Sequence, residues 1–145
     1  MIKMFIMSLL MLFSLNVNAI NLDIQEDVVP QLNVNGYRLA VENEILQLYI
    51  NEKAIYKVET KNYFDEVRAT PIRMVLNEDQ ETDKKNTNYI AYMYFDCINK
   101  SNMILCVHVF DKNGKFLREE RQEPYWDDTE ERSNNRTLNE YICRQ

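Results

Sequence analysis

The residues best suited to chemistry in this chain are three cysteines and a single histidine. Cys106 and His108 alternate along one apolar segment, so in a strand both side chains point to the same face. A thiol beside an imidazole is the pair that nucleophilic catalysis uses. Two residues of strand rise separate their Cβ atoms by about 7 Å, which is too far for a direct hydrogen bond. We therefore expect no catalytic pair here, and we interpret His108 as a sheet residue rather than a metal ligand.

Other chemistries find little support in the sequence. The acidic residues occur as adjacent pairs in polar segments, which is typical of solvated side chains rather than of a matched acid and base. With only two glycines, the chain has no Gly-rich phosphate loop. No two cysteines have the close spacing of a structural zinc site, and no acidic segment has the pattern of a calcium loop. We predict a protein that is not an enzyme and that holds no cofactor or metal.

The cysteines allow at most one intramolecular disulfide and leave one thiol. A Cys97–Cys143 bridge would close a loop of about 47 residues and anchor a terminal helix, which stabilises the fold by roughly 2–4 kcal/mol. A Cys97–Cys106 bridge would span one hairpin, where a two-residue turn places the two side chains diagonally. We rank Cys97–Cys143 first and Cys106–Cys143 second, and a turn shifted by one residue would still permit Cys97–Cys106.

Residues 1–19 have the layout of a secretory signal peptide. Lys3 precedes an apolar run from Met4 to Leu15, which only Ser8 interrupts. Small residues, Val17 and Ala19, then occupy the −3 and −1 positions of the cleavage site. The run is shorter than the ~20 apolar residues that span a membrane. We expect cleavage between Ala19 and Ile20 and export to the periplasm or the outside of the cell, where cysteines oxidise, without a stable membrane anchor.

Removal of residues 1–19 leaves a single domain's length of chain, with 16 basic and 23 acidic residues. This negative charge argues against nucleic acid and against anionic lipid as partners, because both carry the same sign of charge. A cationic protein would instead be attracted and would associate faster. The simpler interpretation, which we favour, is that the charge keeps an exported protein soluble.

Apolar patterns predict mainly strands. We interpret residues 20–35 as a flexible lead-in and residues 36–145 as one α+β domain, an antiparallel sheet of about six strands with a C-terminal helix packed on it. Pro71 is expected to make part of its strand an edge or a bulge. The strand candidates are residues 37–42, 45–50, 54–58, 67–76, 89–95, 103–110 and 116–120. The last three form a meander, whose second turn contains Gly114, a residue that takes positive φ at little cost.

The remaining segments are polar or helical. Residues 77–88 contain no apolar side chain and are interpreted as a solvated loop. The pair Asp127-Asp128, beside Trp126, is interpreted as a helix start, where negative charge is favoured. Thr137 is the predicted N-cap of a final short helix, with Glu140 completing a capping box. Such a helix must dock on the sheet to be stable.

From Gly36 to Cys143 the chain resembles the bacterial surface-adhesin protein E family. The residues that carry the resemblance are Tyr49-Ile50-Asn51-Glu52-Lys53-Ala54-Ile55, Phe95-Asp96-Cys97, Phe110-Asp111 and Tyr141-Ile142-Cys143. The resemblance implies an antiparallel sheet flanked by a C-terminal helix, with Cys97 and Cys143 bridged and Cys106 left as a free thiol. Three features depart from the family: no cysteine follows the signal to carry a lipid, Asn51 replaces an aspartate, and Cys106 is additional.

Proteins of the family's namesake type bind host matrix glycoproteins such as vitronectin and laminin and are displayed on the outer membrane. The resemblance therefore implies an exported binding domain whose partner is a host matrix glycoprotein or a bacterial protein. The alternative is a periplasmic inhibitor or immunity protein that blocks a toxin or hydrolase through its acidic surface. A third reading, from another class, is a thiol-dependent enzyme centred on Cys106.

Overall fold

The computed structural model describes residues 29–62 and 64–145. The expected signal peptide, the Ala19–Ile20 cleavage site and most of the lead-in lie outside the described residues. Within them, eight strands form one antiparallel sheet. The strands are β1 (Arg38–Glu42), β2 (Leu46–Ile50), β3 (Tyr56–Val58), β4 (Val67–Leu76), β5 (Asn88–Asp96), β6 (Ser101–Phe110), β7 (Phe116–Arg121) and β8 (Asp127–Asp128).

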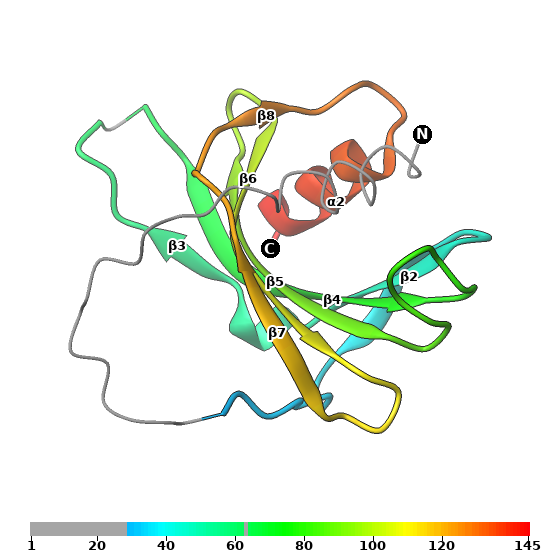
Figure 1. Cartoon of the computed structure of the whole chain (residues 1–145). Helices are drawn as coiled ribbons and strands as arrows, with labels where there is room; N and C mark the ends of the chain where they lie inside the picture. Colours follow the sequence, from blue (N-terminus) through cyan, green and yellow to red (C-terminus); the bar gives the residue numbers. More distant parts are fainter. Residues whose placement is uncertain (1–28, 63) are drawn as a thin grey trace.

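Six of these strands follow the order β1-β2-β4-β5-β6-β7, while β3 pairs with β4 and β8 pairs with β6. The sheet is strongly curved, and the helix α2 (Asn134–Cys143) lies against its concave face (Figure 1). Leu138 and Ile142 of α2 are buried in the same apolar cluster as the inward-facing residues of β2, β4, β5 and β6. The predicted α+β fold, an antiparallel sheet with a C-terminal helix packed on it, is confirmed.

Strand β4 as a whole is not an edge strand, but one of its sides is unpaired at Pro71, which agrees with the predicted edge in part of the strand. Strand β4 lies inside the sheet, between β5 on one side and both β2 and β3 on the other. The last β2–β4 pair is Ile50 with Ile72, and the nearest β3–β4 pair is Tyr56 with Ala69. Pro71 therefore faces the gap between β2 and β3, where a missing N–H costs the ladder little.

The turn between β2 and β3 is one of the four segments that carry the family resemblance. A single 3₁₀ turn, η2 (Glu52–Ala54), follows Asn51, whose side-chain oxygen accepts a hydrogen bond from the Lys53 backbone N–H at 3.2 Å. Asparagine and aspartate both supply this acceptor. The replacement of the family's aspartate by Asn51 therefore keeps the turn's local hydrogen bond.

The first turn of the meander lies earlier than predicted. Asp96 pairs with Ser101, so the turn contains residues 97–100 and β6 begins at Ser101 rather than at Met103. The register then shifts at Leu105, because Met93 pairs with Ile104 and Tyr92 pairs with Cys106. Such a bulge is set by tertiary pairing and leaves no mark in the period of the apolar residues. In the second turn, Gly114 adopts a φ of +81°, as predicted.

Two predictions about the C-terminal region are wrong. Asp127 and Asp128 form β8 against the start of β6 rather than a helix start. The helix begins at Asn134, with Ser133 as its N-cap, and the Ser133 hydroxyl accepts a hydrogen bond from the Arg136 N–H at 3.1 Å. Thr137 lies inside the first turn, where its hydroxyl donates to the Ser133 carbonyl at 3.1 Å. Serine caps as well as threonine does, so sequence preference alone did not separate the two positions.

The polar segment 77–88 folds back onto the sheet instead of remaining fully solvated. Its Asp83 is buried and accepts two hydrogen bonds from Arg118 of β7, at 3.0 and 2.8 Å. Tyr89 donates a further hydrogen bond to the same carboxylate. Burial raises the pKa of Asp83, but these hydrogen bonds outweigh it, so the pKa lies below its ordinary value. The loop is thus fixed by one buried charge.

Candidate functional site

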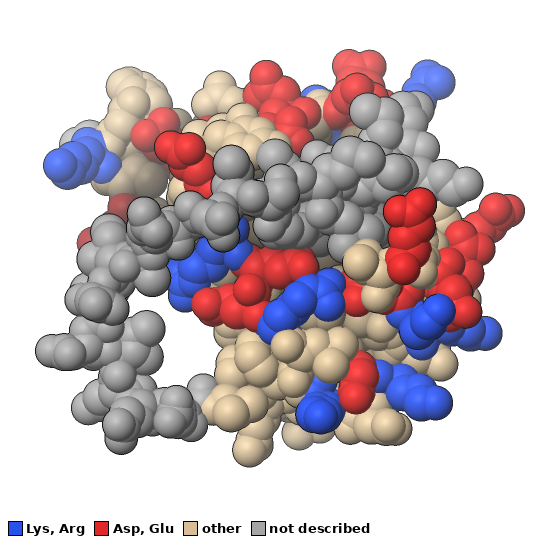
Figure 2. Space-filling view, in the orientation of Figure 1, with Lys and Arg blue, Asp and Glu red and all other residues tan. Residues whose placement is uncertain are grey.

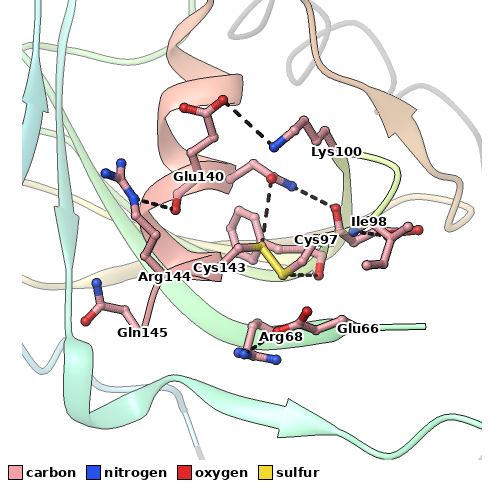
Figure 3. The surroundings of a disulfide bond; sticks show 12 residues. Glu66, Arg68, Cys97, Ile98, Lys100, Glu140, Cys143, Arg144 and Gln145 are labelled. Atoms are coloured by element: carbon pink, nitrogen blue, oxygen red, sulfur yellow. Dashed lines mark hydrogen bonds and ion pairs between the residues drawn. A yellow bond between two sulfur atoms is a disulfide. The ribbon is translucent and has the colours of Figure 1, made fainter. Parts of the chain in front are cut away.

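A disulfide fixes one end of the molecule. Cys97 directly follows β5 and Cys143 ends α2, and their sulfur atoms are 2.02 Å apart, with Cα atoms 5.5 Å apart. Figure 3 shows the bond between the helix and the strands, and the Cys97 N–H donates to the Glu66 carbonyl at 2.8 Å. This is the pairing ranked first from the sequence and implied by the family resemblance. Cys106 pairs with Tyr92, far along the hairpin from Cys97, and remains a free thiol.

Asn139 of α2 reinforces the same end. Its side chain is fully buried, and its amide nitrogen donates to the carbonyl oxygens of Asp96 and Ser101 and to the side-chain oxygen of Asn102, at 2.9–3.3 Å. The helix therefore holds both sides of the β5–β6 turn by polar contacts as well as by the disulfide. Buried polar groups that are satisfied in this way fix one arrangement of the backbone.

Large apolar side chains are exposed on the segments that meet here. Phe64 in the β3–β4 loop is 83 % exposed, Ile98 in the β5–β6 turn is 58 % exposed, and Trp126 beside β8 is 43 % exposed. The Cys97–Glu66 hydrogen bond joins the first two segments, and pairing of β8 with Ser101 and Asn102 joins the third. We call Phe64, Ile98 and Trp126 the loop-end surface. The three side chains are exposed at one end of the sheet, and exposed apolar side chains are used at protein-binding sites.

A second group of side chains gathers on the outer face of the sheet. Strand register places His108 opposite Glu119 and Cys106 opposite Arg121. A hydrogen bond of 2.8 Å joins His108 Nε2 to a carboxylate oxygen of Glu119. Sγ of Cys106, the nearer histidine nitrogen and the carboxylate oxygen lie within 4.8 Å of one another. The structure makes no hydrogen bond between Cys106 and His108 among the described residues, so these two residues do not form an activated thiol pair.

Electrostatics on this face keep the thiol protonated. Burial raises the pKa of Cys106, and this effect exceeds the lowering caused by Arg121. The hydrogen bond from Arg121 lowers the pKa of Glu119 and outweighs burial, which raises it. The hydrogen bond to His108 lowers the pKa of Glu119 further. A nucleophilic cysteine needs the opposite shift, since the thiolate is the reactive form.

Glu119 is the member of this group that the sequence reasoning missed. Its placement depends on the β6–β7 register, which the turn around Gly114 and a bulge set together. Counting back from the Phe110–Phe116 pair places residue 118 opposite residue 108, and the register shift between Val109 and Phe110 moves this pairing to Glu119. The carboxylate pairs considered from the sequence were adjacent residues, and Glu119 contacts His108 across strands instead.

Charge is dispersed on the visible face of the molecule. In the view of Figure 2, Asp and Glu side chains alternate with Lys and Arg and do not form one acidic patch among the described residues. The prediction of an inhibitor or immunity protein relied on an acidic surface, and no feature of this face favours it. No helix within residues 29–62 and 64–145 has the length and apolar character needed to cross a membrane.

A family model, described as surface-adhesin protein E, matches residues 38–144. The matched region begins with β1 and ends just after α2, so it contains the whole described sheet, the helix and both disulfide cysteines. No match was found among curated proteins or among solved structures.

Proposed function

Because the family model covers most of its length, the chain belongs to the surface-adhesin protein E family, and we propose that it is an exported domain that acts by binding another protein without catalysis. Family membership supports a surface-adhesin-like binding domain. The finer proposal is that the partner is a host extracellular-matrix glycoprotein. We further propose that residues 1–19 are a signal peptide removed before Ile20, that 20–35 is a lead-in and that 36–145 is the binding domain.

The observation that carries this proposal is the loop-end surface. Phe64, Ile98 and Trp126 expose apolar area on three segments that belong to different parts of the chain. Large aromatic side chains at the centre of an interface supply most of its binding free energy. The Cys97–Cys143 bond and Asn139 hold the supporting segments in place, so little ordering free energy is lost when a partner binds.

Export is supported by the disulfide. A structural cystine in a domain of this size persists in the periplasm or outside the cell, where reducing thiols do not open it. The signal-like residues 1–19 provide the corresponding export address. The raised pKa of Cys106 argues against the third reading, a thiol-dependent enzyme.

The test measures binding of the purified protein to immobilised vitronectin and laminin by biolayer interferometry. Phe64→Ala and Trp126→Ala should each weaken binding by about 10- to 30-fold, the effect of losing an aromatic interface anchor. Leu117→Ala is the matched control, since Leu117 is 46 % exposed but lies on β7, near the opposite end of β6. Its affinity should equal that of the unmodified protein.

Three outcomes would count against the proposal. If the unmodified chain binds neither vitronectin nor laminin, the proposal of a host-matrix partner is contradicted. Equal losses in Leu117→Ala and Trp126→Ala would show that the loop-end surface is not the contact region. An N-terminus other than Ile20 in the exported protein, measured by intact mass, would contradict the proposed cleavage.

A further inference from the structure

We propose that Cys106, His108 and Glu119 form a binding site for a divalent transition-metal ion, with Zn²⁺ as the ion that fits best. This site is separate from the loop-end surface and from protein binding. The three side chains supply one sulfur, one imidazole nitrogen and one carboxylate oxygen, the set of donors that zinc uses in proteins. Magnesium and calcium prefer oxygen ligands alone, so the donor set selects against them.

The spacing of the donors fits a tetrahedral ion after small side-chain movements. All three donor atoms lie within 4.8 Å of one another. With metal–ligand bonds of about 2.0–2.3 Å, tetrahedral donors lie roughly 3.3–3.8 Å apart. The His108–Glu119 separation, 2.8 Å, must therefore widen. Side-chain rotation must supply this adjustment, since the register of β6 and β7 fixes the backbone positions of the three residues.

The surrounding residues hold the ligands in place. The His108 ring contacts Tyr92 and Phe116 edge-on, with ring centroids 5.1 and 5.9 Å apart. Arg121 donates from Nε to one carboxylate oxygen of Glu119 at 2.9 Å and from Nη2 to the other at 3.2 Å, and this second oxygen also contacts His108, so a metal ion would replace the contacts at that oxygen while the Nε bond keeps the carboxylate oriented. Partners of this kind orient metal ligands and strengthen binding. All three ligands come from the paired strands β6 and β7, so the site is built on a rigid part of the sheet.

Charge also allows a cation here, although Arg121 lies nearby. A bound ion would convert Cys106 to the thiolate, and together with the Glu119 carboxylate this supplies two negative charges to the metal. The Glu119 carboxylate also pairs with Arg121, so its single negative charge is shared between Arg121 and the metal, and the thiolate of Cys106 supplies the other negative charge. Cys97 and Cys143 are joined to each other, which leaves Cys106 as the one cysteine able to bind a metal. Three protein ligands leave the fourth position for water.

The experiment titrates Zn²⁺ into the purified, metal-free protein under anaerobic conditions, in competition with a chromophoric chelator. A thiol assay first verifies one free thiol per chain, so that the disulfide is known to be intact. We expect one Zn²⁺ per chain and protection of Cys106 from alkylation by iodoacetamide. Substitution with Co²⁺ should give a thiolate-to-cobalt charge-transfer band in the near ultraviolet.

Cys106→Ser, His108→Ala and Glu119→Gln should each lower the Zn²⁺ affinity by at least about 10- to 100-fold, since even the outer partners of a metal site contribute that much. Glu123→Gln, at an exposed carboxylate outside the cluster, is the control and should bind as the unmodified chain does. Unchanged affinity in Cys106→Ser would overturn the site. So would an alkylation rate of Cys106 in the unmodified chain that Zn²⁺ does not alter, a result that does not depend on how any variant folds.

Discussion

Arg118 holds Asp83 through two parallel hydrogen bonds, from Nη1 at 3.0 Å and from Nη2 at 2.8 Å. The guanidinium also donates from Nε to Glu120 at 2.6 Å, so it is fixed by two carboxylates from two parts of the chain. Bidentate pairs of this type are strong because both geometry and charge favour them. The contact joins the loop after β4 to β7, the last strand of the meander. Its contribution to stability can therefore be measured by changing Asp83.

Asp83→Asn should destabilise the protein by about 1–3 kcal/mol, because it removes a buried charge partner and weakens the bonds from Arg118 and Tyr89. The cost is below that of a fully buried pair, since the Arg118 side chain keeps 35 % exposure to water. Urea denaturation at pH 7 measures the change. Glu81→Gln, at an exposed position of the same loop, is the control and should change stability by less than about 0.5 kcal/mol.

The same pair predicts a pH dependence. The pKa of Asp83 is lowered in the folded protein, so the ionised carboxylate stabilises the fold above the pKa of the unfolded chain, near 4. That contribution is lost as the pH falls through the lower, folded value. The stability difference between the unmodified protein and Asp83→Asn should therefore stay constant from about pH 7 to pH 5 and shrink below about pH 4. A difference that grows in acid would contradict this assignment.

Removal of the disulfide in Cys97→Ser/Cys143→Ser should lower the free energy of unfolding by roughly 2–4 kcal/mol, chiefly because the unfolded chain gains freedom. The bond spans 46 residues of sequence and anchors a helix of 10 residues, so α2 should lose protection from hydrogen exchange first. Cys106→Ser is the control and should cost less than about 1 kcal/mol without added metal. An equal effect of both changes would show that the bridge contributes nothing specific.

Asn139→Ala should destabilise the protein by about 2–4 kcal/mol. The change leaves a small cavity where the buried side-chain amide was, and the carbonyl oxygens of Asp96 and Ser101 lose a hydrogen-bond donor. Thermal unfolding followed by circular dichroism measures the loss. Asn135→Ala on the same helix is the control, because the Asn135 side chain has no hydrogen-bond partner within the described part of the chain. Equal losses of stability in the two variants would contradict a specific role of the Asn139 amide, because alanine is the better helix former at both positions.

The local pattern of apolar residues was sufficient to predict the positions of most strands. Strand β4 has the bounds predicted from its apolar residues, and β5 is central, as its apolar residues on both faces indicated. Gly114 marked the second turn of the meander because positive φ restricts that position to few residue types. The first turn was misplaced, since residues 97–102 are polar throughout except for Cys97 and Ile98 and several turn positions satisfy the same pattern.

The sequence by itself determined the segments that form strands, the charge of the molecule, the possible cysteine pairings and the residues of the family resemblance. These features follow from local composition and residue spacing, which are the same in the unfolded and the folded chain. Only the tertiary structure decided that Asp83 of a polar loop is buried, that Pro71 lies inside the sheet and that Glu119 contacts His108. Each depends on which strands pair and in what register, and a shift of one residue exchanges the two faces of a strand. Free energy from contacts distant in sequence, rather than local propensity, selects that register.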